Sequence, residues 1–224
     1  MARDQYNIIS ESDASTVVST YKAKQQSSSC YQSEAELEAA LIAQLQEQGY
    51  EYLPIHQETD LLLNLRNQIE RLNNYRFSDE DWDKFFKEHI SNPNMGYIEK
   101  SHLLQSDHVR PLRLRDGSTK NIYLIDKQAL ANNRLQVINQ YVAEGGSYAN
   151  RYDVSILVNG LPLVHIELKR RGVALKEAFN QIRRYGRESF WAGSGLYEYV
   201  QVFVISNGTE TKYYSNTTRN KHLE

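Results

Sequence analysis

A chain of 224 residues with 40% hydrophobic and 24% charged side chains is long enough to bury a substantial core as one domain. Its formal net charge of −2 excludes a globally basic nucleic-acid binder, although a local basic patch is compatible with that total. The chain has no secretory signal, no apolar stretch near the ~18 residues of a membrane span, and a single cysteine, Cys30, which together predict a cytoplasmic protein without disulfides or a cysteine-based zinc site.

The N-terminal part of the chain predicts an arm followed by helices. Residues 1–30 are polar and rich in serine, and a short strand or helix and a mobile arm are both open for them. "SEAELEAALIAQLQEQGY" predicts a helix that Ser33 and Glu36 begin with a capping box and Gly49 ends. "TDLLLNLRNQIERLNNY" and "SDEDWDKFFKEHI" predict two further helices, the second capped by Ser78.

The remainder of the chain predicts strands around one more helix. "HVRPLRLRDGSTKNIYLID" contains Asp116-Gly117, a strong hairpin signal. "ALKEAFNQIRRYGRESFW" predicts a fourth helix, "YVQVFVISNG" a strand in the middle of a sheet, and "TKYYSNT" a last short strand. This order predicts an α/β fold, more specifically an α+β arrangement in which helices flank a central mixed β-sheet.

Three charged residues lie in a pair of apolar strands, "RYDVSILVNGLPLVHIELKRRG". A charge in or near a core is costly unless it is paired or holds a metal. Glu167 and Lys169 share one face of the second strand. Asp153 and Glu167 can supply oxygen ligands to Mg²⁺, and the carbonyl of Leu168 can add another. Lys169 can stabilise the negative charge that develops during phosphodiester hydrolysis.

The turn at Asn-Gly decides whether these charges meet. A two-residue loop pairs Val158 with Leu161, and this register puts Asp153 and Glu167 on opposite faces of the hairpin. A regular hairpin closed in that way has no carboxylate pair.

A three-residue loop with a left-handed Gly160 gives the other register. It pairs Leu157 with Leu161, so that Asp153 lies opposite His165 and diagonal to Glu167. We predict this loop, because of the two it alone gathers the charges. His165 then either pairs with the carboxylate of Asp153 or only fills space.

Further polar residues follow the strand pair, and one precedes it. Between residues 169 and 187, seven basic residues accompany one acid, Glu177, which predicts a surface for phosphates or a solvated helix face. Gln181 and Tyr185 project from one face of the helix there. Glu38 is a lone glutamate on the first helix. The seven basic residues are Lys169, Arg170, Arg171, Lys176, Arg183, Arg184 and Arg187.

Together these stretches resemble the PD-(D/E)xK nuclease superfamily, and more closely the N-terminal nuclease domain of the R (motor) subunit of type I restriction enzymes. The resemblance covers most of residues 31–217. The matching stretches are "SEAELEAALIAQLQEQGYEYL", "LRNQIERLNNYRFSDEDWDKFF", "RYDVSILVNGLPLVHIELKRRG", "NQIRRY" and "FVISNGTETKYYSN".

The resemblance implies a restriction-endonuclease-like fold and a set of site residues. Asp153, Glu167 and Lys169 match the catalytic set, in which the two acids and the Leu168 carbonyl bind the metal. Glu38 matches a helix glutamate near the metal site. The residues implied in DNA contact or in support of the active site are Gln181 and Tyr185, which match a Gln-x-x-x-Tyr motif, and the basic residues Arg170, Arg171, Arg183 and Arg184.

The resemblance also implies a function and partners. We expect a Mg²⁺-dependent endonuclease that cuts double-stranded DNA without sequence specificity of its own and assembles with modification and specificity subunits. The chain has no G-x-x-x-x-G-K-[ST] motif, so ATP is expected to serve only a motor region outside it. Two other functions are open: a non-catalytic nuclease-like scaffold that binds DNA or partner subunits, and a stand-alone structure-selective or RNA nuclease.

Three segments are expected on these grounds. Residues 1–30 form the polar arm and residues 31–217 the nuclease domain. Residues 218–224 form a tail whose final Leu-Glu resembles a vector remnant, and the whole is expected to be a fragment of a longer motor subunit.

Overall fold

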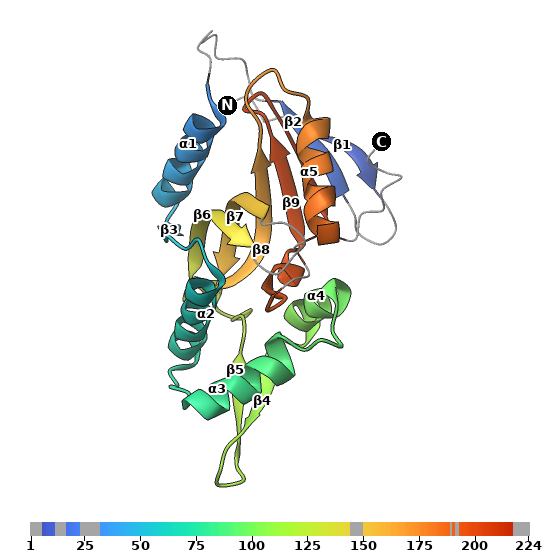
Figure 1. Ribbon diagram of the computed structural model, residues 1–224. Coiled ribbons are helices and arrows are strands. Elements are labelled where there is room, and N and C mark those ends of the chain that lie inside the picture. Colours follow the sequence, from blue (N-terminus) through green and yellow to red (C-terminus); the bar gives the residue numbers. More distant parts are fainter. Residues whose placement is uncertain are drawn as a thin grey trace.

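The computed structural model describes residues 6–11, 17–22, 32–143, 150–188, 190 and 193–216. Helices flank a central mixed sheet of eight strands (Figure 1). The strands are β1 (Tyr6–Glu11), β2 (Val17–Lys22), β3 (Glu51–Tyr52), β6 (Leu135–Ala143), β7 (Asn150–Val158), β8 (Leu161–Leu168), β9 (Val202–Ser206) and β10 (Glu210–Ser215). They lie in the order β1-β2-β10-β9-β8-β7-β6-β3, with β8 parallel to β9 and β3 parallel to β6. The predicted fold class is confirmed.

Helices and a small hairpin complete the described chain. The helices are α1 (Glu34–Glu47), α2 (Glu58–Asn73), α3 (Asp79–Phe85), α4 (Tyr97–Ser106) and α5 (Leu175–Glu188), with a π-helical turn η1 (Phe86–Ile90) and 3₁₀ turns η2 (Leu130–Asn132) and η3 (Leu196–Tyr199). The predicted hairpin around Asp116-Gly117 is formed by β4 (Val109–Arg113) and β5 (Thr119–Tyr123), which make a separate two-stranded sheet. None of these described helices combines the length and apolar character needed to cross a bilayer.

The predicted capping box begins α1. The Ser33 hydroxyl accepts the Glu36 N–H at 3.2 Å, and the Glu36 carboxylate accepts the Ser33 N–H at 2.7 Å. Two of the otherwise unpaired N–H groups at the helix start are satisfied in this way. The apolar side of α1 packs on the sheet in a small core cluster that contains Leu45, Val154 and Ile166.

The opposite face of the sheet carries the main core. α2 contributes Leu61, Leu65 and Ile69, all fully buried, and α5 contributes Ala178 and Ile182. Aromatic rings fill the space between β7, β8 and α5, and most of them pack edge-on or tilted, at centroid distances of 4.6 to 6.4 Å. This aromatic cluster consists of Tyr152, His165, Tyr185, Phe190, Tyr197 and Phe203.

The sequence analysis did not predict α4, because a charged residue occupies the face of this helix that packs on the core. Lys100 is 2% exposed, where an apolar residue would be expected in an amphipathic helix. Its ammonium donates to the Gly195 carbonyl at 3.0 Å and pairs with the Glu198 carboxylate. A buried polar residue whose partners are about a hundred positions away breaks the apolar periodicity of the helix.

The prediction of a three-residue loop between β7 and β8 is wrong. The turn has two residues, because Val158 pairs with Leu161. Asn159 and Gly160 both adopt left-handed conformations, with φ of 50° and 83°. Positive φ at both central residues is the geometry of a type I′ turn, which suits the twist of a hairpin.

A bulge in β8 brings the charged side chains together, as the predicted three-residue loop would have done. Leu157 pairs with Pro162, but Ile156 pairs with Val164, so Leu163 is an extra residue in β8. Because one extra residue shifts every later pair by one, His165 pairs with Ser155 and not with Asp153 as predicted, and Asp153 follows the last pair, Val154 with Ile166, on the side of Glu167.

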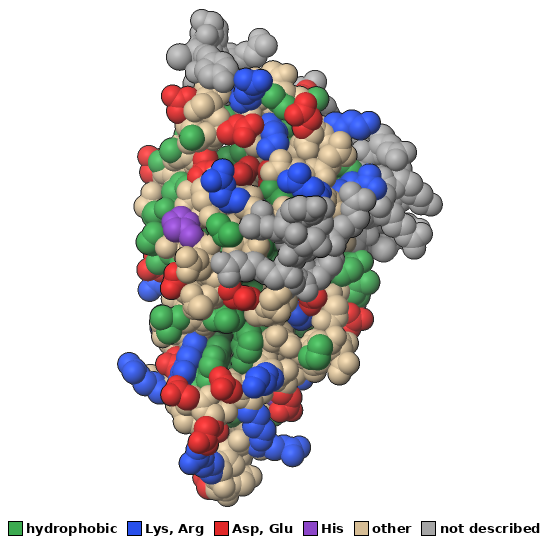
Figure 2. Space-filling model, in the orientation of Figure 1, with side chains coloured by type: hydrophobic (Ala, Val, Ile, Leu, Met, Phe, Trp, Pro, Cys, Tyr) green, Lys and Arg blue, Asp and Glu red, His purple; other side chains and the backbone are tan. Residues whose placement is uncertain are grey.

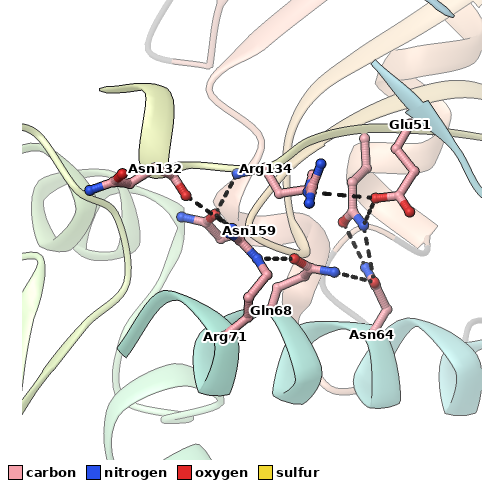
Figure 3. Close-up of polar contacts among 8 residues, drawn as sticks. Glu51, Asn64, Gln68, Arg71, Asn132, Arg134 and Asn159 are labelled. Carbon is pink, nitrogen blue, oxygen red and sulfur yellow. Dashed lines mark hydrogen bonds and ion pairs between the residues drawn. The ribbon is translucent and has the colours of Figure 1, made fainter. Parts of the chain in front are cut away.

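The turn is anchored to α2 by close packing and by a polar network (Figure 3). The Asn159 side chain accepts the Arg134 N–H at 2.9 Å and donates to the Leu124 carbonyl at 3.1 Å. Arg71 of α2 donates to the same Asn159 oxygen at 3.4 Å. Gln68, Asn64, Gln136 and Glu51 continue the network between α2 and the sheet edge.

The N-terminal segment contributes strands where it is described. β1 pairs with β2, and β2 pairs with β10, so both lengthen the sheet at the edge opposite β3. Residues 6–11 and 17–22 of the predicted arm are strands, and the rest of residues 1–30 lies outside the described residues. The predicted tail at 218–224 lies outside the described residues.

Candidate active site

The candidate site lies where β7 and β8 separate. Their last pair is Val154 with Ile166, although β8 continues to Leu168. Beyond that pair the Leu168 N–H donates to the Asp153 carboxylate, at 2.9 Å, in place of a strand carbonyl. The Asp153 side chain therefore turns into the split between the strands and faces β8.

Glu167 and Lys169 complete a compact charged group with Asp153. Glu167 is fully buried, and its Oε1 accepts a hydrogen bond from Lys169 Nζ at 3.2 Å. The same ammonium donates to the Leu168 carbonyl at 3.0 Å. The structure thus brings together the two acids, the amine and the carbonyl that the sequence pattern selected.

The two carboxylates affect each other unequally: the charge of Glu167 raises the pKa of Asp153, whereas a hydrogen bond with Asp153 lowers the pKa of Glu167. Burial raises the pKa of Asp153 to about 7, and the negative charge of Glu167 adds to this shift. Burial likewise raises the pKa of Glu167 to about 7, although the neighbouring Lys169 opposes the shift. Two such groups near neutral pH hold a proton between them or bind a cation.

The residues present fit a divalent cation. Glu167 Oε2 is buried and has no hydrogen-bond partner among the described residues. Over all the residues that the structure describes, no three His, Cys, Asp or Glu side chains cluster as a metal-binding set. Two carboxylates with one backbone carbonyl suit Mg²⁺, which binds few protein oxygens and keeps several waters. The Leu168 carbonyl already accepts Lys169, and its second lone pair is available.

Glu38 is held near the site by amides. Asn139 Nδ2 donates to Glu38 Oε1 at 2.6 Å, and Gln140 Nε2 donates to the other carboxylate oxygen. Gln140 lies across from Asp153, because the β6–β7 pairs on either side are 139 with 154 and 141 with 152. Both Glu38 oxygens therefore bond to the strand next to Asp153, which places Glu38 beside the site without joining it to the carboxylate pair.

Tyr185 of α5 contacts β7 close to the candidate site, and Gln181 contacts Tyr185. The Tyr185 hydroxyl accepts the Gln181 amide and donates to the Arg151 carbonyl at 2.9 Å. Burial raises the pKa of Tyr185 to about 12. Since Tyr185 is 1% exposed and bonds to the β7 backbone two residues before Asp153, its contacts fit support of the active site and leave it no surface for DNA.

The predicted basic residues are exposed around the site. Arg170 and Arg171 follow β8 directly, and Arg183 and Arg184 lie on α5. Figure 2 shows Lys and Arg side chains, with acidic ones among them, over the part of the molecule where Figure 1 places α5.

The structure shows one contact and one backbone conformation near the site that the sequence analysis missed. Glu34, in the first turn of α1, accepts the Arg170 N–H at 3.2 Å, and its charge helps raise the pKa of Glu167. Gln140 adopts a left-handed conformation with φ of 52°, which is costly for a residue other than glycine. Glu34 could have been noticed from its place next to the capping box, whereas no sequence signal marks a left-handed glutamine.

A comparison with family models decides the relationship. The model described as "Type I restriction enzyme R protein N terminus" matches residues 31–222. The chain belongs to this family. It is an R-protein N-terminal domain, in agreement with the resemblance seen in its motifs.

Curated relatives of this R-protein domain are endonuclease subunits of type I restriction enzymes. The EcoprrI subunit of Escherichia coli is 47% identical over 212 residues, which cover 94% of this chain and 67% of the relative. The SsaAORF53P subunit of Staphylococcus saprophyticus is 41% identical over 188 residues, and the HindI subunit of Haemophilus influenzae is 29% identical over 198 residues. The chain spans only 20% and 18% of the lengths of these two relatives.

Proposed function

We propose that this R-protein domain is an endonuclease that hydrolyses phosphodiester bonds of double-stranded DNA with Mg²⁺ and without sequence specificity of its own. The observation that carries the proposal is the pair formed by the buried Glu167 and the half-buried Asp153, with the Lys169 ammonium on Glu167. Relatives named endonuclease subunits support the same reaction class.

Asp153, Glu167 and the Leu168 carbonyl would hold the cation. When bound, a divalent ion offsets the charge of the two acids and stabilises negative charge on the phosphate. Asp153 is already oriented by the Leu168 N–H, and Glu167 by Lys169, so little reorganisation is needed at the protein side.

Lys169 is assigned two tasks. Its ammonium donates to both Glu167 and the Leu168 carbonyl, so it fixes the orientation of the Glu167 carboxylate. The same positive charge can stabilise the developing charge of the phosphate and orient the attacking water.

The surroundings of the site fit a DNA substrate. Arg170 and Arg171 at the end of β8, and Arg183 and Arg184 on α5, are exposed and can contact DNA phosphates. The proposed partners are modification and specificity subunits. The proposed location is the cytoplasm. The proposed nuclease domain comprises residues 31–217.

Cleavage of supercoiled plasmid by the purified chain, with Mg²⁺ or Mn²⁺, tests the proposal. Asp153→Asn, Glu167→Gln and Lys169→Ala should each reduce the rate of nicking by roughly 10²–10³-fold, because each removes a charged group that acts on the phosphate or the cation. Glu47→Gln, at an exposed position of α1, is the matched control and should cleave like the unmodified chain.

Two outcomes would contradict the proposal. Nicking that survives both carboxylate substitutions would place the chemistry elsewhere or in a contaminant. A chain that binds DNA equally well in all variants and cleaves none of it with either metal would be the non-catalytic scaffold. DNA binding by each variant, measured alongside cleavage, separates these two outcomes.

A further inference from the structure

His165 lies directly behind the carboxylate pair and has no role in the function proposed above. It is fully buried in β8, two residues before Glu167, so both side chains project from the same face of the strand. The imidazole Nε2 lies 3.4 Å from Glu167 Oε2. This is the oxygen that does not contact Lys169, which bonds to Oε1.

Packing alone does not explain a histidine at this position. Neither ring nitrogen of His165 has a hydrogen-bond partner in the described residues, and neither does Glu167 Oε2. Buried polar atoms without partners are rare because each loses its hydrogen bonds with water. Phenylalanine or leucine would fill the same space without that cost, so the polar edge of the imidazole needs an explanation other than packing.

The surrounding rings fix the direction of that edge. Tyr152, Tyr185, Phe190 and Phe203 enclose His165 at centroid distances of 5.3, 6.0, 5.4 and 6.4 Å, with interplanar angles between 68° and 75°. Edge-on packing on several sides leaves the ring little freedom to turn. The Nε2 edge is therefore held toward Glu167.

We propose that His165 is a positioning residue for Glu167. With hydrogen on Nε2, the imidazole donates toward Oε2 while Lys169 donates to Oε1, so the two groups hold the carboxylate from both sides. The contact is long for a hydrogen bond, as such contacts often are before substrate binds. This inference rests on the proposed function, because it assigns Glu167 as a ligand whose orientation matters.

Metal binding in the absence of DNA tests the role directly. Mn²⁺ is titrated into the purified chain by calorimetry, and thermal unfolding is recorded for every variant. His165→Leu should weaken Mn²⁺ binding about 10- to 100-fold, the usual effect of losing a group that orients a metal ligand, while the melting temperature stays equal or rises. His165→Gln, which restores an N–H donor at a similar distance from the backbone, should recover most of the affinity.

Ser155→Ala is the matched control. Ser155 pairs with His165 across the hairpin, but its hydroxyl contacts the Tyr197 hydroxyl at 3.1 Å and no carboxylate. It should therefore leave Mn²⁺ binding unchanged. If His165→Leu fails to fold, His165→Phe carries the same prediction, because a phenyl ring suits the aromatic cluster.

The result that would overturn the role is a His165→Leu or His165→Phe variant that folds and binds Mn²⁺ as tightly as the unmodified chain. Asp153→Asn in the plasmid assay separates this failure from failure of the proposed function. Cleavage retained by Asp153→Asn removes the proposed site itself, whereas an inactive Asp153→Asn with normal Mn²⁺ binding by the His165 variant removes only the positioning role.

Discussion

Asp153, which is half-buried, and Glu167, which is fully buried, are unfavourable for the fold as neighbouring carboxylates and useful for binding a cation. The pKa of each is raised to about 7, chiefly by burial. Lys169 offsets one negative charge but not both. Without a cation, the folded chain must either keep a proton on the pair or tolerate the repulsion between two ionised groups.

The stability of the metal-free chain should therefore fall as pH rises. An unfolded Asp153 titrates near 3.8 and the folded one near 7, so between these pH values the folded state binds more protons, and the free energy of unfolding decreases with increasing pH. Asp153→Asn should flatten this dependence and raise the melting temperature at pH 8 by about 2–4 °C, while Glu47→Gln should not.

Thermal unfolding with a chelator, followed across pH 4 to 8, measures this effect. Addition of Mg²⁺ should stabilise the unmodified chain at pH 8 but not the Asp153→Asn variant. Identical pH profiles for the two proteins would show that Asp153 is not held in the unfavourable state described here.

At the scale of elements, the β7–β8 hairpin is positioned by the contact of its turn with α2. A Cβ on Gly160 would lie 2.6 Å from the Cα of Leu65, and the backbone there has a φ of 83°. Both the space and the conformation require glycine. The turn in turn sets the register that leads to Asp153 and Glu167.

Gly160→Ala should reduce the free energy of unfolding by about 2–5 kcal/mol, because a left-handed alanine and a clash with α2 add together. Gly117→Ala is the matched control. Its φ of 84° is almost the same, but a Cβ there would meet nothing within 4 Å, so only the conformational cost of about 1–2 kcal/mol remains. Urea unfolding of the two variants measures the difference, and equal losses would mean that the contact with α2 contributes nothing.

α5 is joined to β7 through the Tyr185 hydroxyl, which bonds to the backbone close to Asp153. Tyr185→Phe should cost about 1–3 kcal/mol of stability, because it leaves the Arg151 carbonyl and the Gln181 amide without this partner, and it should slow plasmid nicking. Tyr214→Phe is the control, since its buried hydroxyl has no partner in the described residues and its loss should be neutral or stabilising. Equal effects of the two substitutions would argue against a bracing role for Tyr185.

For the whole molecule, charge distribution matters more than the net charge of −2. Arg171 and Arg183 are exposed near the site, and Arg113 is exposed on the distant β4–β5 hairpin. If the surface around the site contacts phosphates, Arg171→Ala and Arg183→Ala should each lower the slope of log K against log salt by about 0.9. Arg113→Ala should leave the slope unchanged. DNA binding by anisotropy at several salt concentrations gives the slopes, and a larger effect of Arg113 would move the interface to the hairpin.

Local signals in the sequence predicted much of this molecule. The capping box at Ser33, the hairpin at Asp116-Gly117 and the central strand at 202–206 depend on residues that are close in sequence, and the structure confirms all three. α4 went unrecognised because the partners of Lys100 lie in the distant segment 195–198. The role of His165 likewise depends on rings contributed by other elements.

The sequence by itself determined which chemical groups the site contains: an aspartate, a glutamate and a lysine at the end of two strands, followed by a basic helix. Only the tertiary structure decided that they face one another. A shift of one residue reverses the face of every side chain in a strand, and here the shift arises from the bulge at Leu163 behind a two-residue turn held against α2. Such a register depends on packing between segments far apart in the chain, which no local pattern in the sequence encodes.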